Sequence, residues 1–223
     1  MIFPMRTVIL SDTHLRDKFE PAKFNFLFKL LSSVDQIIIN GDFFDGHLIT
    51  FDDFVKSKWS NLFPLMKQKN TIYIYGNHDI QKMSDDRVNL FSMKHVHEYR
   101  LPVGDKMLTI MHGHQIVLFG TDPPFYPVTG WWKVFALGYE FLEEIYVRIF
   151  GKYFSWQYSI FNNVMKKWAI ANLQENEILV TGHIHSAEFN PNKQFINTGI
   201  TRHGLAQYLL IDDGKMRLVH ERY

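Results

Sequence analysis

Residues 7–14 of the chain read Thr-Val-Ile-Leu-Ser-Asp-Thr-His, an apolar run that ends abruptly in polar side chains. Such a run predicts a short buried strand, with the polar residues just beyond its carboxyl end. Residues 21–31 follow with helical spacing of apolar side chains, and residues 36–40 read as a second strand. This strand–helix–strand order predicts a parallel or mixed sheet covered by helices, with ligands bound outside the carboxyl ends of the strands.

The same alternation continues along the chain and places it in the α/β class. A helix is predicted at residues 52–66, and further strands are predicted at residues 71–75, 107–111 and 177–181, near Phe195, and at 205–211 and 216–220. The last two strands flank Asp212-Asp213-Gly214, a favourable hairpin turn. We expect one domain over residues 1–223, because this length and a hydrophobic content of 46% suit a single core.

Residues 123–174 interrupt this order and predict a helical insertion in two stretches, separated around Gly151. The first stretch carries two neighbouring apolar stripes, Val134, Leu137, Phe141, Ile145 and Ile149 beside Trp131, Phe135, Leu142, Tyr146 and Phe150. Together they make an apolar face that is wide for a covering helix. Two interpretations stay open: the helices pack onto the core, or they cap a site and receive acyl chains at a boundary with water.

Bulk composition excludes several classes of site. The formal net charge is +1, so the whole molecule gives no electrostatic argument for a nucleic-acid partner, and none is expected. The absence of cysteine excludes disulfides and thiolate metal sites, whereas 11 histidines suit imidazole ligation. Neither an apolar stretch of about 18 residues nor a secretory signal is found. We expect a cytoplasmic protein, with peripheral contact at the inner membrane surface left open.

Five polar clusters each follow an apolar, strand-like run. They are Asp12-Thr13-His14, Gly41-Asp42-Phe43-Phe44-Asp45, Gly76-Asn77-His78-Asp79, His112-Gly113-His114 and Gly182-His183-Ile184-His185. Alternate residues of an extended segment point the same way, so Asp12 with His14, and His183 with His185, are each expected to present two ligands to one side. Imidazole, carboxylate and amide ligands suit divalent ions such as Mn²⁺, Fe²⁺ or Zn²⁺. The glycine that starts three of the clusters is expected to permit tight turns close to a ligand.

These five clusters, in this order, resemble the calcineurin-like metallophosphoesterase family, whose pattern runs Asp-x-His, Gly-Asp-x-x-Asp, Gly-Asn-His-Asp/Glu, His and Gly-His-x-His. The resemblance spans residues 12–185. It implies a central β-sandwich flanked by helices in an αββα arrangement, with a helical cap, and a centre of two divalent metal ions, Mn²⁺ foremost. By the same resemblance one metal is held by Asp12, His14 and His185, and the other by Asn77, His112 and His183, with Asp42 bridging.

The resemblance also implies catalytic roles for His78, which would meet the substrate phosphate or the leaving group, and for Asp79, which would orient His78. Physical chemistry supports these roles independently. Two metal ions about 3.5–4 Å apart stabilise an in-line displacement, and a histidine close to the leaving oxygen acts as a general acid when a carboxylate fixes its orientation.

Other polar residues are interpreted as supporting groups. Asp45 is expected to orient a ligating histidine. His114, at a position where related enzymes often carry Asp, is expected to line the site or to support a ligand. Arg202 is read either as a contact to substrate oxygens or as an ordinary surface residue. The loop residue His47 is interpreted more readily as exposed than as part of the cleft.

The place of the helical insertion, between the His112 and Gly182 clusters, resembles the layout of UDP-2,3-diacylglucosamine hydrolases, which cleave a pyrophosphate in the lipid A pathway at the membrane surface. Two departures are His114 in place of Asp and Ser186-Ala187 in place of an Arg-Pro pair. The preferred substrate is therefore a nucleotide-linked lipid, and the first alternative is a soluble phosphodiesterase or phosphatase acting on nucleotides or other small phosphoesters. A noncatalytic scaffold is disfavoured because every ligand position is present. The oligomeric state stays open.

Overall fold

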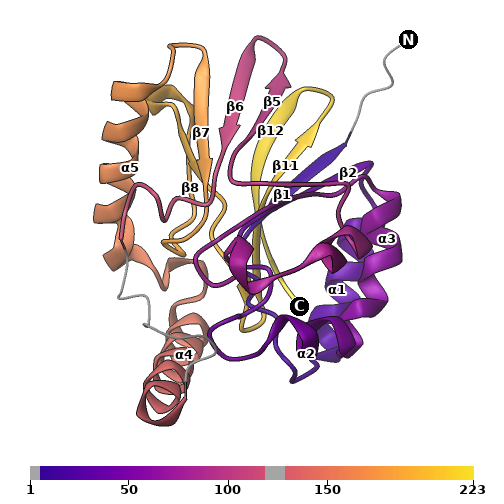
Figure 1. The fold of residues 1–223 in the computed structure, drawn as a ribbon. Helices are drawn as coiled ribbons and strands as arrows, with labels where there is room; N and C mark the ends of the chain where they lie inside the picture. Colours follow the sequence, from indigo (N-terminus) through magenta and orange to yellow (C-terminus); the bar gives the residue numbers. More distant parts are fainter. Residues whose placement is uncertain (1–5, 119–128) are drawn as a thin grey trace.

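Two β-sheets lie face to face in the computed structural model, which describes residues 6–118 and 129–223 (Figure 1). The first sheet has the strand order β10-β11-β1-β2-β3-β4, with β12 paired to β11. Its strands are β1 (Thr7–Leu10), β2 (Gln36–Asn40), β3 (Ile72–Ile74), β4 (Lys94–Val96), β10 (Thr201–Arg202), β11 (Leu205–Asp212) and β12 (Lys215–Arg222). Strands β1 to β4 are parallel, so their carboxyl ends share one edge of the sheet.

The second sheet has the order β5-β6-β7-β9-β8 and mixes both pairing directions. Its strands are β5 (Tyr99–Val103), β6 (Lys106–Ile110), β7 (Glu177–Thr181), β8 (Glu188–Asn190) and β9 (Phe195–Asn197). Strands β6, β7 and β9 are parallel, whereas the outer strands β5 and β8 run antiparallel to their neighbours. A second set of parallel carboxyl ends therefore lies at one edge of this sheet.

The alternating side chains of β1 show how the layers form. Ile9 belongs to the apolar core between the two sheets, whereas Val8 and Leu10 belong to a second core on the other face of the first sheet. Helices α1 (Pro21–Ser32), α2 (Phe51–Lys56) and α3 (Phe63–Gln68) cover that face, and α5 (Ser159–Asn172) covers the second sheet (Figure 1). The predicted αββα sandwich is confirmed.

Strands predicted at residues 7–10, 36–40 and 177–181 are confirmed to the residue. The single helix predicted at residues 52–66 is wrong, because Ser57 adopts an extended backbone after α2 and starts a 3₁₀ turn, Lys58–Leu62. Helix α3 then begins afresh with Pro64 in its first turn, where a missing N–H costs nothing. The sequence does not predict strands β4, β8 and β10, because they are too short to show the alternation of apolar and polar side chains that is typical of a strand.

The predicted insertion contains α4 (Gly130–Phe150) and α5, joined by the 3₁₀ turns Gly151–Tyr153 and Trp156–Tyr158. Residues 123–128 of the prediction lie outside the described residues. Met165 and Ala169 of α5 pack against Leu179 and Phe195 of the second sheet. Helix α5 is therefore a layer of the sandwich, and only α4 extends beyond the sandwich (Figure 1).

Helix α4 buries charged side chains and exposes apolar ones, which is the reverse of an ordinary covering helix. Its buried residues are Glu140, Glu143 and Val147. Much of its predicted apolar face is exposed, including Trp131, Val134, Phe135, Phe141, Leu142 and Ile149. Carboxylates are rarely buried unless they are paired, so the burial of both glutamates indicates specific partners in the body of the protein. No helix within the described residues combines the length and apolarity needed to cross a membrane.

Candidate metal centre

Polar loops from both sheets meet at one end of the sandwich. The loops after β1, β2, β3, β6 and β7 carry, in that order, Asp12 with His14, Asp42 with Asp45, Asn77 with His78, His112, and His183 with His185. A hydrogen bond joins loops of the two sheets here, because the Asp12 side-chain oxygen Oδ2 accepts from the backbone N–H of His183 at 3.0 Å. The predicted meeting of the five clusters is therefore confirmed in space.

Left-handed backbone, rather than extended backbone, aims many of these side chains. The φ angles are 53° at Asp12, 43° at His14, 52° at Asp42, 67° at His183 and 58° at His185. The expectation that Asp12–His14 and His183–His185 present two ligands through strand alternation is wrong in its geometry, because each pair lies in a turn beyond the strand end. Such conformations are uncommon outside glycine and cluster at functional sites.

Two glycines allow the loops to approach the carboxylates closely. A Cβ added at Gly182 would overlap Asp12 Oδ2 and the side chain of Ser11, and one at Gly76 would overlap the carboxylate of Asp42. The close approach is therefore to the carboxylates of the site, whereas the sequence predicts an approach to a ligand. Only a residue without a side chain leaves room for the aspartates here.

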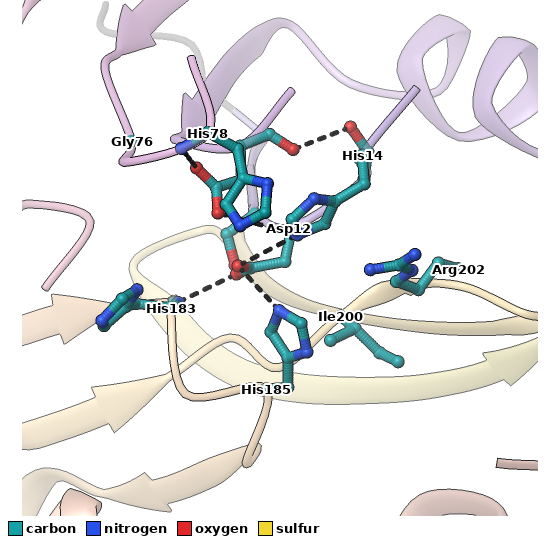
Figure 2. Close-up of polar contacts among 12 residues, drawn as sticks. Asp12, His14, Gly76, His78, His183, His185, Ile200 and Arg202 are labelled. Atoms are coloured by element: carbon teal, nitrogen blue, oxygen red, sulfur yellow. Dashed lines mark hydrogen bonds and ion pairs between the residues drawn. The ribbon is translucent and has the colours of Figure 1, made fainter. Parts of the chain in front are cut away.

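Each central aspartate is held by one oxygen and directs the other toward the histidines. Asp42 Oδ1 accepts a hydrogen bond from the His78 N–H at 2.8 Å, while Asp42 Oδ2 lies 3.2 Å from His112 Nε2 and 3.6 Å from His14 Nε2. Asp12 Oδ1, opposite the oxygen held by His183, lies 3.3 Å from His185 Nε2. Figure 2 shows the rings of His14, His78, His183 and His185 arranged around Asp12.

The histidines use their second ring nitrogen to fix their orientation. His112 Nδ1 is 2.8 Å from the Asn40 carbonyl oxygen, which leaves Nε2 facing Asp42 and, at 3.2 Å, the side-chain oxygen of Asn77. His183 Nε2 is 2.8 Å from the Val117 carbonyl oxygen. Backbone carbonyl partners of this kind are typical of metal-ligating histidines.

The residues fit a divalent cation. Asp12, His14 and His185 form one group whose ligand atoms lie within 4.8 Å of one another, and Asp12, Asp42 and His112 form a second. Asp12 Oδ1 and both ring nitrogens of His14 are buried and make no hydrogen bond of normal geometry, although Asp12 Oδ1 lies 3.3 Å from His185 Nε2 and His14 Nδ1 lies 3.8 Å from Asp45 Oδ2. Leaving such atoms unsatisfied costs about 1–3 kcal/mol each, so the cluster is shaped for a ligand that would satisfy them. His183 lies beside the second group, its ring 5.2 Å from that of His112.

The carboxylates of the cluster favour positive charge on the groups around them. Burial opposes charge on His112 and His185, yet neighbouring carboxylates raise the pKa of His112 to about 9 and that of His185 to about 10. Burial similarly opposes charge on Asp12, whose pKa is nevertheless held below its usual value by His112 and His185. Burial lowers the pKa of His14 to about 3, so this ring favours the neutral form that binds metals.

The predicted orientation of His78 by Asp79 is wrong. The Asp79 carboxylate accepts hydrogen bonds from the N–H groups of Asp42, Phe43 and Gly76 and from the Tyr73 hydroxyl, at 2.7–3.0 Å. It braces two site loops, and burial together with Asp42 raises its pKa to about 6. The prediction failed because neighbours in sequence need not be neighbours in space. The turn that exposes His78 directs the side chain of Asp79 into the core.

Asp45 occupies the place that was assigned to Asp79. Its Oδ1 is 3.0 Å from His78 Nδ1, and its Oδ2 is 3.8 Å from Nδ1 of the candidate ligand His14. The expectation that Asp45 orients a site histidine agrees with this geometry. His47, read as exposed, is in fact buried and stacks on His78, with ring centroids 3.7 Å apart. Its position two residues after Asp45 was the available signal.

Two glutamates of α4 reach this site and were missed as site residues. Glu143 Oε1 lies 2.5 Å from His185 Nδ1, and Glu143 Oε2 lies 3.1 Å from His203 Nε2. Glu140 pairs with Arg202 at 2.5 Å and with Arg16 at 2.6 Å. The signal in the sequence was the spacing of Glu140 and Glu143, which places two carboxylates three residues apart on one side of a largely apolar helix.

Arg202 and His114 lie at the rim of the centre. The guanidinium of Arg202 is buried between Glu140 and Glu143 and lines a pocket of about 390 Å³ that also touches His14, Arg16 and Lys18. The surface alternative for Arg202 is therefore wrong. The ring of His114 lies 5.6 Å from that of His112, consistent with a residue that lines the site.

Comparison with known proteins finds similarity over most of the chain. The model of the family described as calcineurin-like phosphoesterase matches residues 5–187. An archaeal phosphodiesterase is similar in structure, with a TM-score of 0.53 and 15% identity over 97% of this chain and 99% of that chain. Vacuolar protein sorting 29 from Cryptosporidium parvum has a TM-score of 0.50 and 16% identity over 99% and 98%. These structures share the fold, and no curated protein sequence matches the chain significantly.

Proposed function

The chain belongs to the calcineurin-like phosphoesterase family, and on this premise we propose that it hydrolyses a phosphoester or phosphoanhydride with two divalent cations, Mn²⁺ foremost and Fe²⁺ or Zn²⁺ as alternatives. The observation that carries the proposal is the pair Asp12 and Asp42. Each carboxylate is fixed through one oxygen by a backbone N–H, and each turns its other oxygen toward buried histidines.

The proposed ligand sets are those that the family pattern implies, and the first of them coincides with a group of ligand atoms described above. Asp12, His14 and His185 would hold one cation, and Asn77, His112 and His183 the other, with Asp42 between them. The two aspartates support a pair of neighbouring cations, since each carboxylate lies 3.2–3.9 Å from histidines of both sets. Cations bound here would polarise a phosphoryl oxygen and offset the charge that develops during displacement.

His78 is proposed as the general acid. Its side chain is 27% exposed, whereas that of Asp45 behind it is 4% exposed, so the ring faces the opening of the site with a buried carboxylate at its back. Burial opposes its charge, but Asp42 and Asp45 raise the pKa of His78 to about 8. A protonated ring at neutral pH is suited to donate a proton to a leaving oxygen.

We propose a nucleotide-linked lipid, such as UDP-2,3-diacylglucosamine, as the preferred substrate, cleaved at its pyrophosphate. Two features support this choice. Basic side chains outnumber acidic ones in the lining of the rim pocket, although Arg16 and Arg202 also pair with Glu140, and this excess suits an anionic substrate. A second pocket of about 200 Å³, lined by side chains such as Leu142, Tyr146 and Phe154, lies against α4 and suits an apolar chain.

The exposed apolar residues of α4 further suit peripheral contact with a membrane, where such a substrate would reside. We therefore propose that the enzyme works at the inner membrane surface.

The test is a substrate panel with Mn²⁺-reconstituted protein. It compares UDP-2,3-diacylglucosamine, an unacylated UDP-sugar, a bis-aryl phosphodiester and an aryl monophosphate, with product release followed by chromatography. Selective cleavage of the acylated substrate is expected. Cleavage of the simple esters alone would leave the hydrolase standing and assign it to small soluble phosphoesters. An Asp42→Asn variant is the background control, and no cleavage of any substrate would contradict the proposal.

A further inference from the structure

Glu143 is a buried carboxylate that joins α4 to the candidate metal centre. One oxygen lies 2.5 Å from His185 Nδ1, and the other lies 3.1 Å from His203 Nε2 and 3.2 Å from an Arg202 nitrogen. His203 and Arg202 lie beside the oxygen that does not contact His185. Both oxygens of the Glu143 carboxylate therefore have a cationic or proton-donating partner. Its 6% exposure shows that water contributes little to its solvation.

The contact orients His185 toward the centre. With Nδ1 engaged by Glu143, Nε2 faces Asp12 Oδ1 at 3.3 Å, in the group that also contains His14. A ring held only at Cβ rotates about two side-chain bonds, and a carboxylate behind the far nitrogen removes that freedom. The ligating edge of His185 therefore depends on a residue that lies 42 positions away in sequence and on a different element.

Among the described residues, helix α4 has two further attachments to the body of the protein that bear on its seating, one of them a hydrogen bond from Arg222 to the Val147 carbonyl oxygen at 3.1 Å. Beyond its two glutamates, Val147 joins a small apolar cluster with Phe154, Ile200 and Leu205. The remaining face of the helix is largely exposed. The carboxylate pairs are thus a large part of what seats α4, and one of those pairs ends on a candidate metal ligand.

We propose that Glu143 is a positioning residue that couples the seating of α4 to metal binding. This inference rests on the proposed function, because it takes His185 as a ligand. A cation that binds His185 holds the ring in the orientation that Glu143 recognises, and a seated α4 holds the same ring ready for the cation. Coupling of this kind is reciprocal, so metal binding and helix seating strengthen each other by the same factor.

The first experiment measures Mn²⁺ affinity by titration calorimetry for Glu143→Gln and for the matched control Glu144→Gln. Glu144 is the next residue of the same helix and pairs only at the surface, with Arg148 at 2.5 Å. Loss of an orienting carboxylate lowers metal affinity by about 10- to 100-fold, and we expect this for Glu143→Gln alone. Equal affinities for the two variants would overturn the inference.

The second experiment needs no variant. Hydrogen exchange of the wild-type backbone amides at Glu140–Val147 is compared with and without Mn²⁺, and slower exchange with Mn²⁺ is expected. In Glu143→Gln the effect of Mn²⁺ on this segment should disappear, and in Glu144→Gln it should persist. Wild-type protein that binds Mn²⁺ with no change in α4 would overturn this inference alone. Wild-type protein that binds no divalent cation would overturn the proposed function as well.

Discussion

Asp45 Oδ1 lies 3.0 Å from Nδ1 of His78, so a buried carboxylate contacts a ring that is partly exposed to solvent. Asp79 is the residue that follows His78 in the sequence. Its carboxylate accepts hydrogen bonds from backbone N–H groups instead of contacting that ring. The two aspartates therefore have separable effects, one on turnover and the other on stability.

Replacement of Asp45 by Asn should lower kcat by about 10- to 100-fold, because His78 loses the carboxylate that orients it. His78→Ala should lower kcat by about 10²- to 10⁴-fold, the usual contribution of general acid catalysis. Because Asp45 acts largely through His78, Asp45→Asn should have little further effect on kcat in the His78→Ala background. Rates at saturating Mn²⁺ test this, and additive losses in the double variant would contradict it.

Asp79→Ala should destabilise the protein by about 3–5 kcal/mol, since four buried donors lose their shared acceptor. Tyr73→Phe removes one of those donors and should cost about 1 kcal/mol. Urea unfolding of the metal-free variants measures both free energies. Similar losses for the two substitutions would show that the Asp79 carboxylate has less structural weight than its contacts indicate.

Gly182→Ala should weaken Mn²⁺ binding by at least about 10-fold, because the new Cβ displaces Asp12 from its place. Gly138→Ala is the matched control, since Gly138 lies in α4 with no atom near the position of an added Cβ. This change should stabilise the helix by about 0.5–1 kcal/mol without altering metal affinity. Unchanged affinity in Gly182→Ala would show that the loop can shift to accept the methyl group.

Lys23 should make stability rise with pH. The side chain is buried, its Nζ donates to the Thr13 carbonyl oxygen at 2.5 Å, and burial lowers its pKa to about 7. An unfolded lysine has a pKa of about 10.4, so between about pH 7 and pH 10 the unfolded state binds more protons at this position. The free energy of unfolding should then increase by at most about 1.4 kcal/mol per pH unit.

Below about pH 7 both states are protonated, and this contribution becomes constant. Urea unfolding of wild type and Lys23→Met across this range isolates the effect as the difference between the two pH profiles. Parallel profiles would indicate that Lys23 keeps its ordinary pKa in the folded state.

Replacing Trp131 and Phe135 by Ser should reduce cleavage of an acylated nucleotide substrate while sparing a soluble UDP-sugar, because both rings are exposed on α4 and contribute nothing to the core. The ratio of kcat/KM for the two substrates is the measurement. Equal retention of both activities would assign the exposed face of α4 a role other than lipid contact.

The local pattern of apolar and polar residues was enough to predict several strands and the position of the site. Short apolar runs predict the strands at residues 7–10 and 36–40. The polar clusters that follow these runs mark the carboxyl ends of the strands, where the site forms. Because parallel strands in one sheet end at a common edge, the pattern predicts polar clusters at that edge, and the family resemblance implies that Asp12 and Asp42 share one metal centre there.

Tertiary structure decided the partners of those residues. Whether Asp45 or Asp79 supports His78 depends on the turn that separates them, and left-handed backbone at Asp12 and His185 shows no local signature that distinguishes it from extended strand. Nothing in the local sequence distinguishes Glu143 from Glu144, its neighbour, until the fold brings His185 against Glu143 from another layer. Contacts between distant segments depend on the packing of whole elements, and no short window of sequence contains that information.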